Sequence, residues 1–178
     1  IYGDFRGNPA VDEDTPRINP DGYGMTKYVA ECLLRESGLE TLSLRMPGLI
    51  GPGARPVWFT NTVEKFRHGD PVTIYAPDYE TKNFVWVEDV ANFVAKLLQQ
   101  ERWENDRLVL AAKEPVTIRA LVTEIKRLTN STSEIKVAES NRPPFCLNPA
   151  KALAMGYEPM TPIEIVWKYV METGRVAL

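Results

Sequence analysis

The order of helix and strand at the start of the chain restricts its fold more than any other feature. Residues 1–3 (Ile-Tyr-Gly) are typical of a strand end that runs into a loop, and a helix is predicted from Tyr23 to a cap near Gly38. Residues 41–46 then alternate apolar and polar side chains, as a strand does. Strand, helix and strand in this order indicate the βαβ unit of a parallel sheet. The sequence therefore predicts an α/β fold.

The rest of the chain continues the alternation. Two helix starts are marked by caps: Thr117 begins one, and Thr161 with Glu164 forms a capping box around another. Residues 4–22 are predicted to be a loop, and a loop of this length inside a domain is usually functional. Residues 47–53 are expected to be turn. Further helices are predicted at 57–67, 88–99, 117–128, 149–155 and 161–174, and further strands at 72–75, 83–87, 108–111 and 135–137.

Composition excludes several classes of protein. The chain has 178 residues, a net charge of −3 and ordinary hydrophobic content, which argues against a nucleic-acid partner. No apolar run approaches 18 residues and the first residues do not have the pattern of a signal peptide. Cys32 and Cys146 stand in no metal-binding or redox spacing. We therefore expect a reduced cytoplasmic protein that binds no metal and has no membrane-spanning segment. His68 is expected to interact with the dipole at the end of a helix and not to act in catalysis.

Tyr23 and Lys27 are the first candidates for chemistry. Residues four apart lie on the same face of a helix, so the phenol and the ammonium should be neighbours. A cation within about 4–6 Å lowers the pKa of a tyrosine, which could then exchange a proton with an alcohol or ketone. The spacing alone arises by chance in about one such chain in three, and a harmless exposed pair is the alternative.

Further blocks along the whole chain carry a resemblance. Residues 1–3 look like a Val-Tyr-Gly motif, and residues 44–53 are similar to Leu-Arg-x-x-Asn-x-Tyr-Gly-Pro-Gly. Residues 81–90 resemble Arg-Asp-Phe-x-x-Val-x-Asp-Val, and residues 142–159 resemble Arg-Pro…Asp-x-x-Lys-Ala…Leu-Gly-Trp-x-Pro. In this order the blocks resemble the extended short-chain dehydrogenase/reductases, and within them the NAD(P)-dependent sugar-nucleotide epimerases and dehydratases.

This resemblance implies roles for residues around the cofactor. Tyr23 would be the acid/base on the substrate hydroxyl or ketone. Lys27 would lower the pKa of Tyr23 and hold the nicotinamide ribose, and Met46 and Pro47 would lie beside the nicotinamide ring. The cofactor would be NAD or NADP, since the residue that distinguishes them belongs to an earlier strand than those present here.

The resemblance also implies a substrate site. Gly48, Lys82 and Arg142 occupy positions that contact the substrate nucleotide, the two basic residues at its diphosphate. Gly48 replaces an asparagine and Lys82 an arginine, while Asn83 stands in place of an aspartate. Lysine lacks the planar fork with which arginine grips a phosphate. These departures count against a nucleotide diphosphate sugar, and a smaller hydroxy or keto substrate is compatible with them.

Parts of the family's pattern are not found in this sequence. The glycine-rich turn that holds the dinucleotide pyrophosphate does not occur, and the catalytic Ser or Thr would precede Ile1. We therefore expect the C-terminal part of a Rossmann-like parallel sheet with a smaller α+β substrate-binding lobe, lacking on the order of 100 residues. Residues 1–53 would belong to the dinucleotide-binding domain and 54–178 mainly to the lobe, with about 84–112 returning to the cofactor domain.

The predicted function is that of an NAD(P)-dependent epimerase/dehydratase-type oxidoreductase on a sugar nucleotide or related small molecule, with this chain alone inactive. Two alternatives stay open: a non-catalytic binding or regulatory protein that keeps the substrate lobe, and a reductase of a non-nucleotide substrate. In the family, the helix that begins at Tyr23 pairs with that of a second subunit, so a homodimer is expected.

Overall fold

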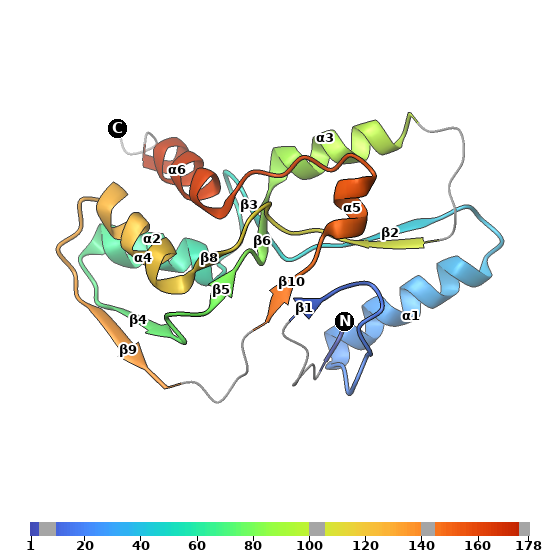
Figure 1. Ribbon diagram of the computed structural model, residues 1–178, viewed down its shortest axis with the longest axis horizontal. Helices are drawn as coiled ribbons and strands as arrows, with labels where there is room; N and C mark the ends of the chain where they lie inside the picture. Colours follow the sequence, from blue (N-terminus) through green and yellow to red (C-terminus); the bar gives the residue numbers. More distant parts are fainter. Residues whose placement is uncertain (4–9, 100–105, 140–144, 175–178) are drawn as a thin grey trace.

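The computed structural model describes residues 1–3, 10–99, 106–139 and 145–174. Figure 1 shows two regions of the chain side by side. Helices α1, α3 and α5 surround strand β2 at one end, whereas helices α2, α4 and α6 gather with strands β4 and β9 at the other end. Among the described residues, four of the five strand pairs are parallel, so the predicted α/β class is confirmed.

The first region contains the predicted helix and strand. Helix α1 (Gly22–Glu36) begins where the Asp21 carboxylate accepts a hydrogen bond from the Gly24 amide at 2.6 Å. Strand β2 (Leu42–Arg45) pairs in parallel with β7 (Asp106–Val109). Helices α3 (Val87–Leu97) and α5 (Ala150–Ala154) cover one side of this strand pair. Their core contains Val85, Val90, Phe93, Leu97, Leu108, Leu110, Ala152 and Tyr157.

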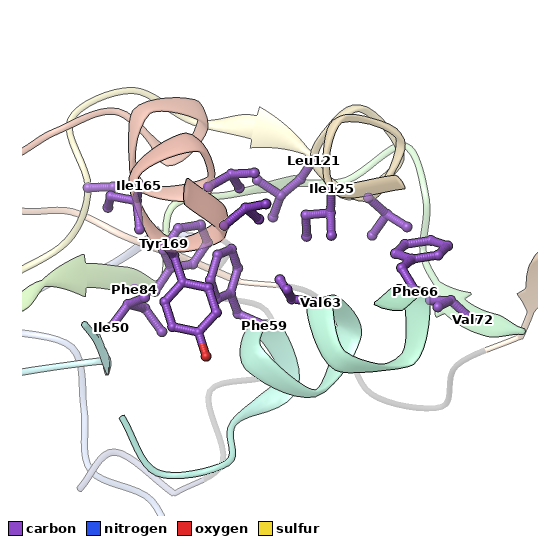
Figure 2. Packing of buried hydrophobic residues seen from close by; sticks show 14 of the residues in the cluster. Ile50, Phe59, Val63, Phe66, Val72, Phe84, Leu121, Ile125, Ile165 and Tyr169 are labelled. Atoms are coloured by element: carbon purple, nitrogen blue, oxygen red, sulfur yellow. The ribbon is translucent and has the colours of Figure 1, made fainter. Parts of the chain in front are cut away.

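The second region is built around three helices, α2 (Trp58–His68), α4 (Ile118–Leu128) and α6 (Pro162–Thr173). Its core is the largest hydrophobic cluster of the described residues (Figure 2). The Phe59 ring stacks on Phe84 with centroids 5.2 Å apart and meets the edge of Tyr169 at 5.4 Å. Two strand pairs flank this core: β4 (Val72–Tyr75) with β9 (Ile135–Ala138) in parallel, and β5 (Glu80–Thr81) with β8 (Val116–Thr117) antiparallel.

Strand β6 (Phe84–Trp86) joins the two regions. It pairs in parallel with β3 (Gly48–Ile50), which follows β2 directly, and it leads into α3. Successive side chains of a strand point to opposite faces. Phe84 and Trp86 accordingly enter the core of the second region, whereas Val85 enters the core of the first. One short buried strand thus serves both cores.

Several sequence predictions were wrong in detail. Part of the predicted loop forms strand β1 (Ala10–Val11), which pairs in parallel with β10 (Cys146–Leu147). Residues 48–50 form β3 where a turn was expected. Residues 1–3 form no strand, because the described residues offer them only a bridge between Gly3 and Ile18.

Helix α1 buries little of its apolar surface. Val29 and Leu33 are exposed, and Gly24 is the one buried residue of the helix. Gly24 packs against the start of the chain so closely that an added Cβ would lie 3.3 Å from the Cα of Ile1. Helix α1 is therefore attached to the rest of the structure by few apolar contacts.

Candidate active site

A cleft of about 910 Å³ lies between α1 and the end of strand β2. The loop that joins β2 to β3 and the segment before β10 also line it. Cavities that hold small molecules fall in the range of about 300–1,000 Å³. The polar and apolar side chains that line the cleft include Tyr2, Tyr23, Lys27, Glu31, Arg45, Met46, Pro47, Asn83, Phe145 and Leu147.

Tyr23 and Lys27 are brought together at the edge of this cleft. They lie in the first two turns of α1, and the Lys27 ammonium nitrogen is 5.3 Å from the centroid of the Tyr23 ring. Tyr23 is 71% exposed, so its hydroxyl is accessible to a ligand. Within the described part of the chain, no ion pair occupies Lys27. Both groups therefore remain available to bind or exchange a proton.

Met46, Pro47 and Gly48 line the same cleft as Tyr23 and Lys27. Strand β2 ends at Arg45, so these three residues follow the carboxyl end of a parallel strand, where ligands of α/β proteins commonly bind. Gly48 has free space around it, since an added Cβ would meet only the Cβ of Phe84, at 3.9 Å. A larger side chain at this position would therefore fit without strain.

Arg45 forms a buried polar cluster at the floor of the cleft. Its Nε and Nη2 atoms donate to the two carboxylate oxygens of Glu31 at 2.8 and 2.7 Å. Its Nη1 atom donates to the Tyr2 hydroxyl at 2.9 Å and to the Glu13 carbonyl at 3.1 Å. Burial alone would lower the pKa of Arg45, but the hydrogen bonds to Glu31 and Tyr2 outweigh it and raise the pKa.

Two other ionisable residues of the cluster, Tyr2 and Glu13, are buried. Burial raises the pKa of the Tyr2 phenol, although the hydrogen bond from Arg45 opposes this effect. The buried Glu13 carboxylate accepts a hydrogen bond from the Val109 amide at 2.6 Å. The cluster thus connects the start of the chain, the loop before α1, the helix itself and strands β2 and β7.

Asn83 fixes the opposite wall of the cleft. Its side-chain amide donates to the Phe145 carbonyl at 2.8 Å and accepts from the Leu147 amide at 2.9 Å. An aspartate could accept the second hydrogen bond but could not donate the first. The amide at position 83 therefore suits the two backbone groups that face it.

Of the two other predicted substrate residues, the structure describes only Lys82, which does not line the cleft. Lys82 adjoins Asn83, and its carbonyl accepts from the Ala112 amide at 3.0 Å, but its side chain is not among those that line the cleft. Arg142 lies outside the described residues. The substrate roles of both residues stay predictions.

The remaining candidates are His68 and the two cysteines, whose surroundings indicate structural and not catalytic roles. A ring nitrogen of His68 is 2.8 Å from the Glu64 carbonyl, in the last turn of α2. Cys32 and Cys146 are free thiols, and burial raises the pKa of Cys146. Among the described residues, no three His, Cys, Asp or Glu side chains lie close enough to hold a metal ion, and no helix is both long and apolar enough to cross a membrane.

Sequence reasoning assigned no role to Glu31, Arg45 or Tyr2. A signal existed for Glu31, which follows Lys27 by one helical turn and so shares its side of α1. Arg45 lies inside a matched block, but its partners are distant in sequence. Only the folded structure shows that its guanidinium is buried and paired with Glu31.

Comparison with known proteins shows to which family the chain belongs. A sequence profile of the NAD dependent epimerase/dehydratase family matches residues 1–111, which include Tyr23, Lys27 and the β2–β3 loop. The chain belongs to this family. Similar curated relatives include UDP-glucuronic acid decarboxylase 1 of Xenopus tropicalis, 27% identical over 92% of this chain, and UDP-glucuronic acid decarboxylase 5 of Arabidopsis thaliana, 26% identical over 79%. The matches cover 42% and 44% of those proteins, so the chain spans less than half of their length.

Solved structures share the fold of this family member. UDP-glucuronic acid 4-epimerase from Bacillus cereus, in complex with NAD, aligns with a TM-score of 0.81 and 18% identity over all of this chain and 59% of its own. dTDP-glucose 4,6-dehydratase from Bacillus anthracis, also in complex with NAD, aligns with a TM-score of 0.77 and 17% identity over 99% of this chain and 59% of its own. At these identities the likeness shows the Rossmann-like fold alone.

Proposed function

We propose that this chain is part of an NAD(P)-dependent oxidoreductase of the epimerase/dehydratase type that acts on a nucleotide sugar. The contact between Tyr23 and Lys27 at the edge of a ligand-sized cleft carries the proposal. It is supported by family membership and by relatives that are named as UDP-glucuronic acid decarboxylases. The complete enzyme would include further sequence, since the relatives are more than twice as long as the part matched here.

In this mechanism Tyr23 takes the proton of a substrate hydroxyl while the carbon that bears it loses a hydride. A bound nicotinamide cofactor would accept that hydride and return it in a later step. Lys27 keeps a positive charge beside the phenol and has donors left for a ribose hydroxyl. Met46 and Pro47 would form the surface against which the nicotinamide rests, at the carboxyl end of β2.

Substitution of Tyr23 by Phe in the full-length protein tests this function. We expect turnover of UDP-glucuronic acid or UDP-glucose with NAD to fall by about 100-fold or more, because proton transfer loses its acid/base. Tyr28→Phe is the matched control: Tyr28 lies on the same helix, where its ring contacts Arg17, and it should keep activity. Full turnover in the Tyr23→Phe protein would contradict the proposed role of Tyr23, whereas no turnover in the wild-type protein would favour a non-catalytic binding protein.

A reductase of a non-nucleotide substrate is the second candidate. It is favoured by Gly48, which places no side chain in the cleft although space for one exists. We propose Gly48, Lys82 and Arg142 as substrate contacts in either case. Calorimetric titration of UDP into the full-length protein separates the candidates: saturable binding supports a nucleotide sugar, and no binding supports the smaller substrate.

We also propose that the enzyme is a homodimer that pairs through α1. Met25, Val29 and Leu33 are spaced four apart on this helix and are all exposed, Leu33 by 67%. Sedimentation equilibrium should give twice the subunit mass, and Leu33→Glu should lower it to the subunit mass. A monomeric wild type would refute this assembly.

The division of the chain between a cofactor domain and a lobe follows the same proposal. We assign residues 1–53 and about 84–112 to the dinucleotide-binding domain and the remainder to the substrate lobe. The parallel pairing of β2 with β7 supports this assignment, because both strands then belong to one sheet.

A further inference from the structure

Helix α1 carries the proposed acid/base but has little apolar contact with the rest of the structure. Gly24 is the single residue that it buries. That contact lies in the first turn, where Gly24 packs against Ile1 and Pro20. Among the described residues this apolar contact fixes the first turn only, so the direction of Tyr23 and Lys27 into the cleft depends on further attachments along the helix.

Arg45 provides the second attachment. It is 8% exposed and comes from β2, a strand paired with β7. Both carboxylate oxygens of Glu31 accept from its guanidinium, in the two-pronged geometry that fixes orientation as well as distance. Tyr2 and the Glu13 carbonyl hold the third nitrogen, so the guanidinium cannot follow the helix if the helix turns.

Glu31 is placed to control the direction of Lys27. Tyr23, Lys27 and Glu31 follow one another at intervals of four along α1, and all three line the cleft. Lys27 therefore lies between the two attachments, one turn from each. A rotation of α1 that released Glu31 would carry Lys27 and Tyr23 away from the cleft together.

We propose that Glu31 and Arg45 are positioning residues that set the rotation of α1 and thereby direct Tyr23 and Lys27 into the cleft. Neither residue needs to contact the reacting atoms for this role. The inference rests on the proposed function for its consequence in catalysis, but the geometric part stands by itself.

Residual dipolar couplings of backbone amides test the geometric part, because they report the rotation of a helix about its axis. In the full chain carrying Glu31→Gln, the couplings of α1 should no longer fit the wild-type orientation, while those of β2, β7 and α4 still do. Glu36→Gln is the matched control, since Glu36 lies on the same helix and forms an exposed ion pair with Arg35. It should leave all couplings unchanged.

A folded Glu31→Gln protein with wild-type couplings in α1 would overturn the proposal. It would show that the ion pair adds stability without setting orientation. If Glu31→Gln does not fold, Glu31→Asp decides, because it keeps the charge but is one methylene too short to keep both hydrogen bonds with α1 in place. A changed α1 orientation in this variant supports the proposal, and an unchanged one overturns it.

A mutant cycle on turnover tests the catalytic consequence. If Glu31 acts only by directing Tyr23 and Lys27, then adding Glu31→Gln to a protein that carries Tyr23→Phe and Lys27→Met should lower its residual activity no further. The losses multiply if Glu31 has an independent role, which would contradict the proposal. Failure of the proposed function would appear differently, as wild-type protein without turnover, and would leave the dipolar couplings to decide the positioning role.

Discussion

Buried charge in this protein is placed where it joins segments distant in sequence. The Arg45 side chain is nearly enclosed, and the Glu31 carboxylate that it binds is 17% exposed. Removing one partner of such a pair leaves the other charge without compensation in a poorly hydrated site. The cost of losing the partner is therefore larger than the net benefit of the pair itself.

Arg45→Met should lower the free energy of unfolding by about 3–5 kcal/mol, because Glu31 is left buried without its partner. Chemical denaturation measures the change. Arg35→Met removes an exposed ion pair with Glu36 and should cause no measurable change. Equal effects of the two substitutions would show that the burial of Arg45 contributes nothing to stability.

Tyr157 presents the opposite case. Its hydroxyl is buried and finds no hydrogen-bond partner among the residues that the structure describes, and burial raises the pKa of its phenol. Tyr157→Phe should therefore raise the free energy of unfolding by about 1 kcal/mol, because an unsatisfied buried hydroxyl is removed. Tyr79→Phe, at an exposed ring, serves as the control in the same denaturation experiment. Destabilisation by Tyr157→Phe would reveal a partner for the hydroxyl.

At the scale of elements, the helix caps follow directly from the sequence. Thr161 and Glu164 form the predicted capping box at the start of α6, and Thr117 caps α4 through the Ala120 amide. Caps depend on residues three positions apart, so local sequence is enough to predict them. The strands β1, β5, β8 and β10 were not predicted, because each is two residues long and forms only through a partner far away in the chain.

The capping box of α6 should make stability depend on pH. Hydrogen bonds from the Thr161 amide and hydroxyl lower the pKa of Glu164 below its ordinary value of 4.5. A lowered pKa in the folded state stabilises the protein above the unfolded pKa, and this contribution is lost as the pH falls through the folded pKa. The difference in unfolding free energy between wild type and Glu164→Gln should thus be full at pH 7 and shrink towards pH 3. A constant difference would contradict the assignment.

At the scale of the whole molecule, the second core holds three helices together. Phe59 of α2 contacts both Phe84 of β6 and Tyr169 of α6 (Figure 2). Phe59→Ala should lower the free energy of unfolding by about 3–5 kcal/mol, because a large side chain leaves a cavity between these elements. Tyr75→Ala, on an exposed ring, should change it by less than 0.5 kcal/mol, about the limit for surface substitutions. Thermal or urea unfolding distinguishes the two.

The candidate site was partly predictable for the same physical reasons. Tyr23 and Lys27 were found because helical spacing makes them neighbours, whereas Met46 and Pro47 were expected beside the cofactor only from the resemblance to the family. The polar floor was not found, because Arg45 meets Tyr2 across 43 positions in the chain. Contacts of this range depend on the folded arrangement of strands and are not encoded in any local pattern.

Strand β6 limits how this protein could change while it evolves. Its three residues separate two hydrophobic cores, one on each face of the strand. The alternation of side chains between these faces therefore matters more than the identity of any one residue. Inserting or deleting a single residue there would exchange the contents of both interiors at once. New substrate preferences should therefore arise through changes in the loops around β6, while β6 itself keeps its length.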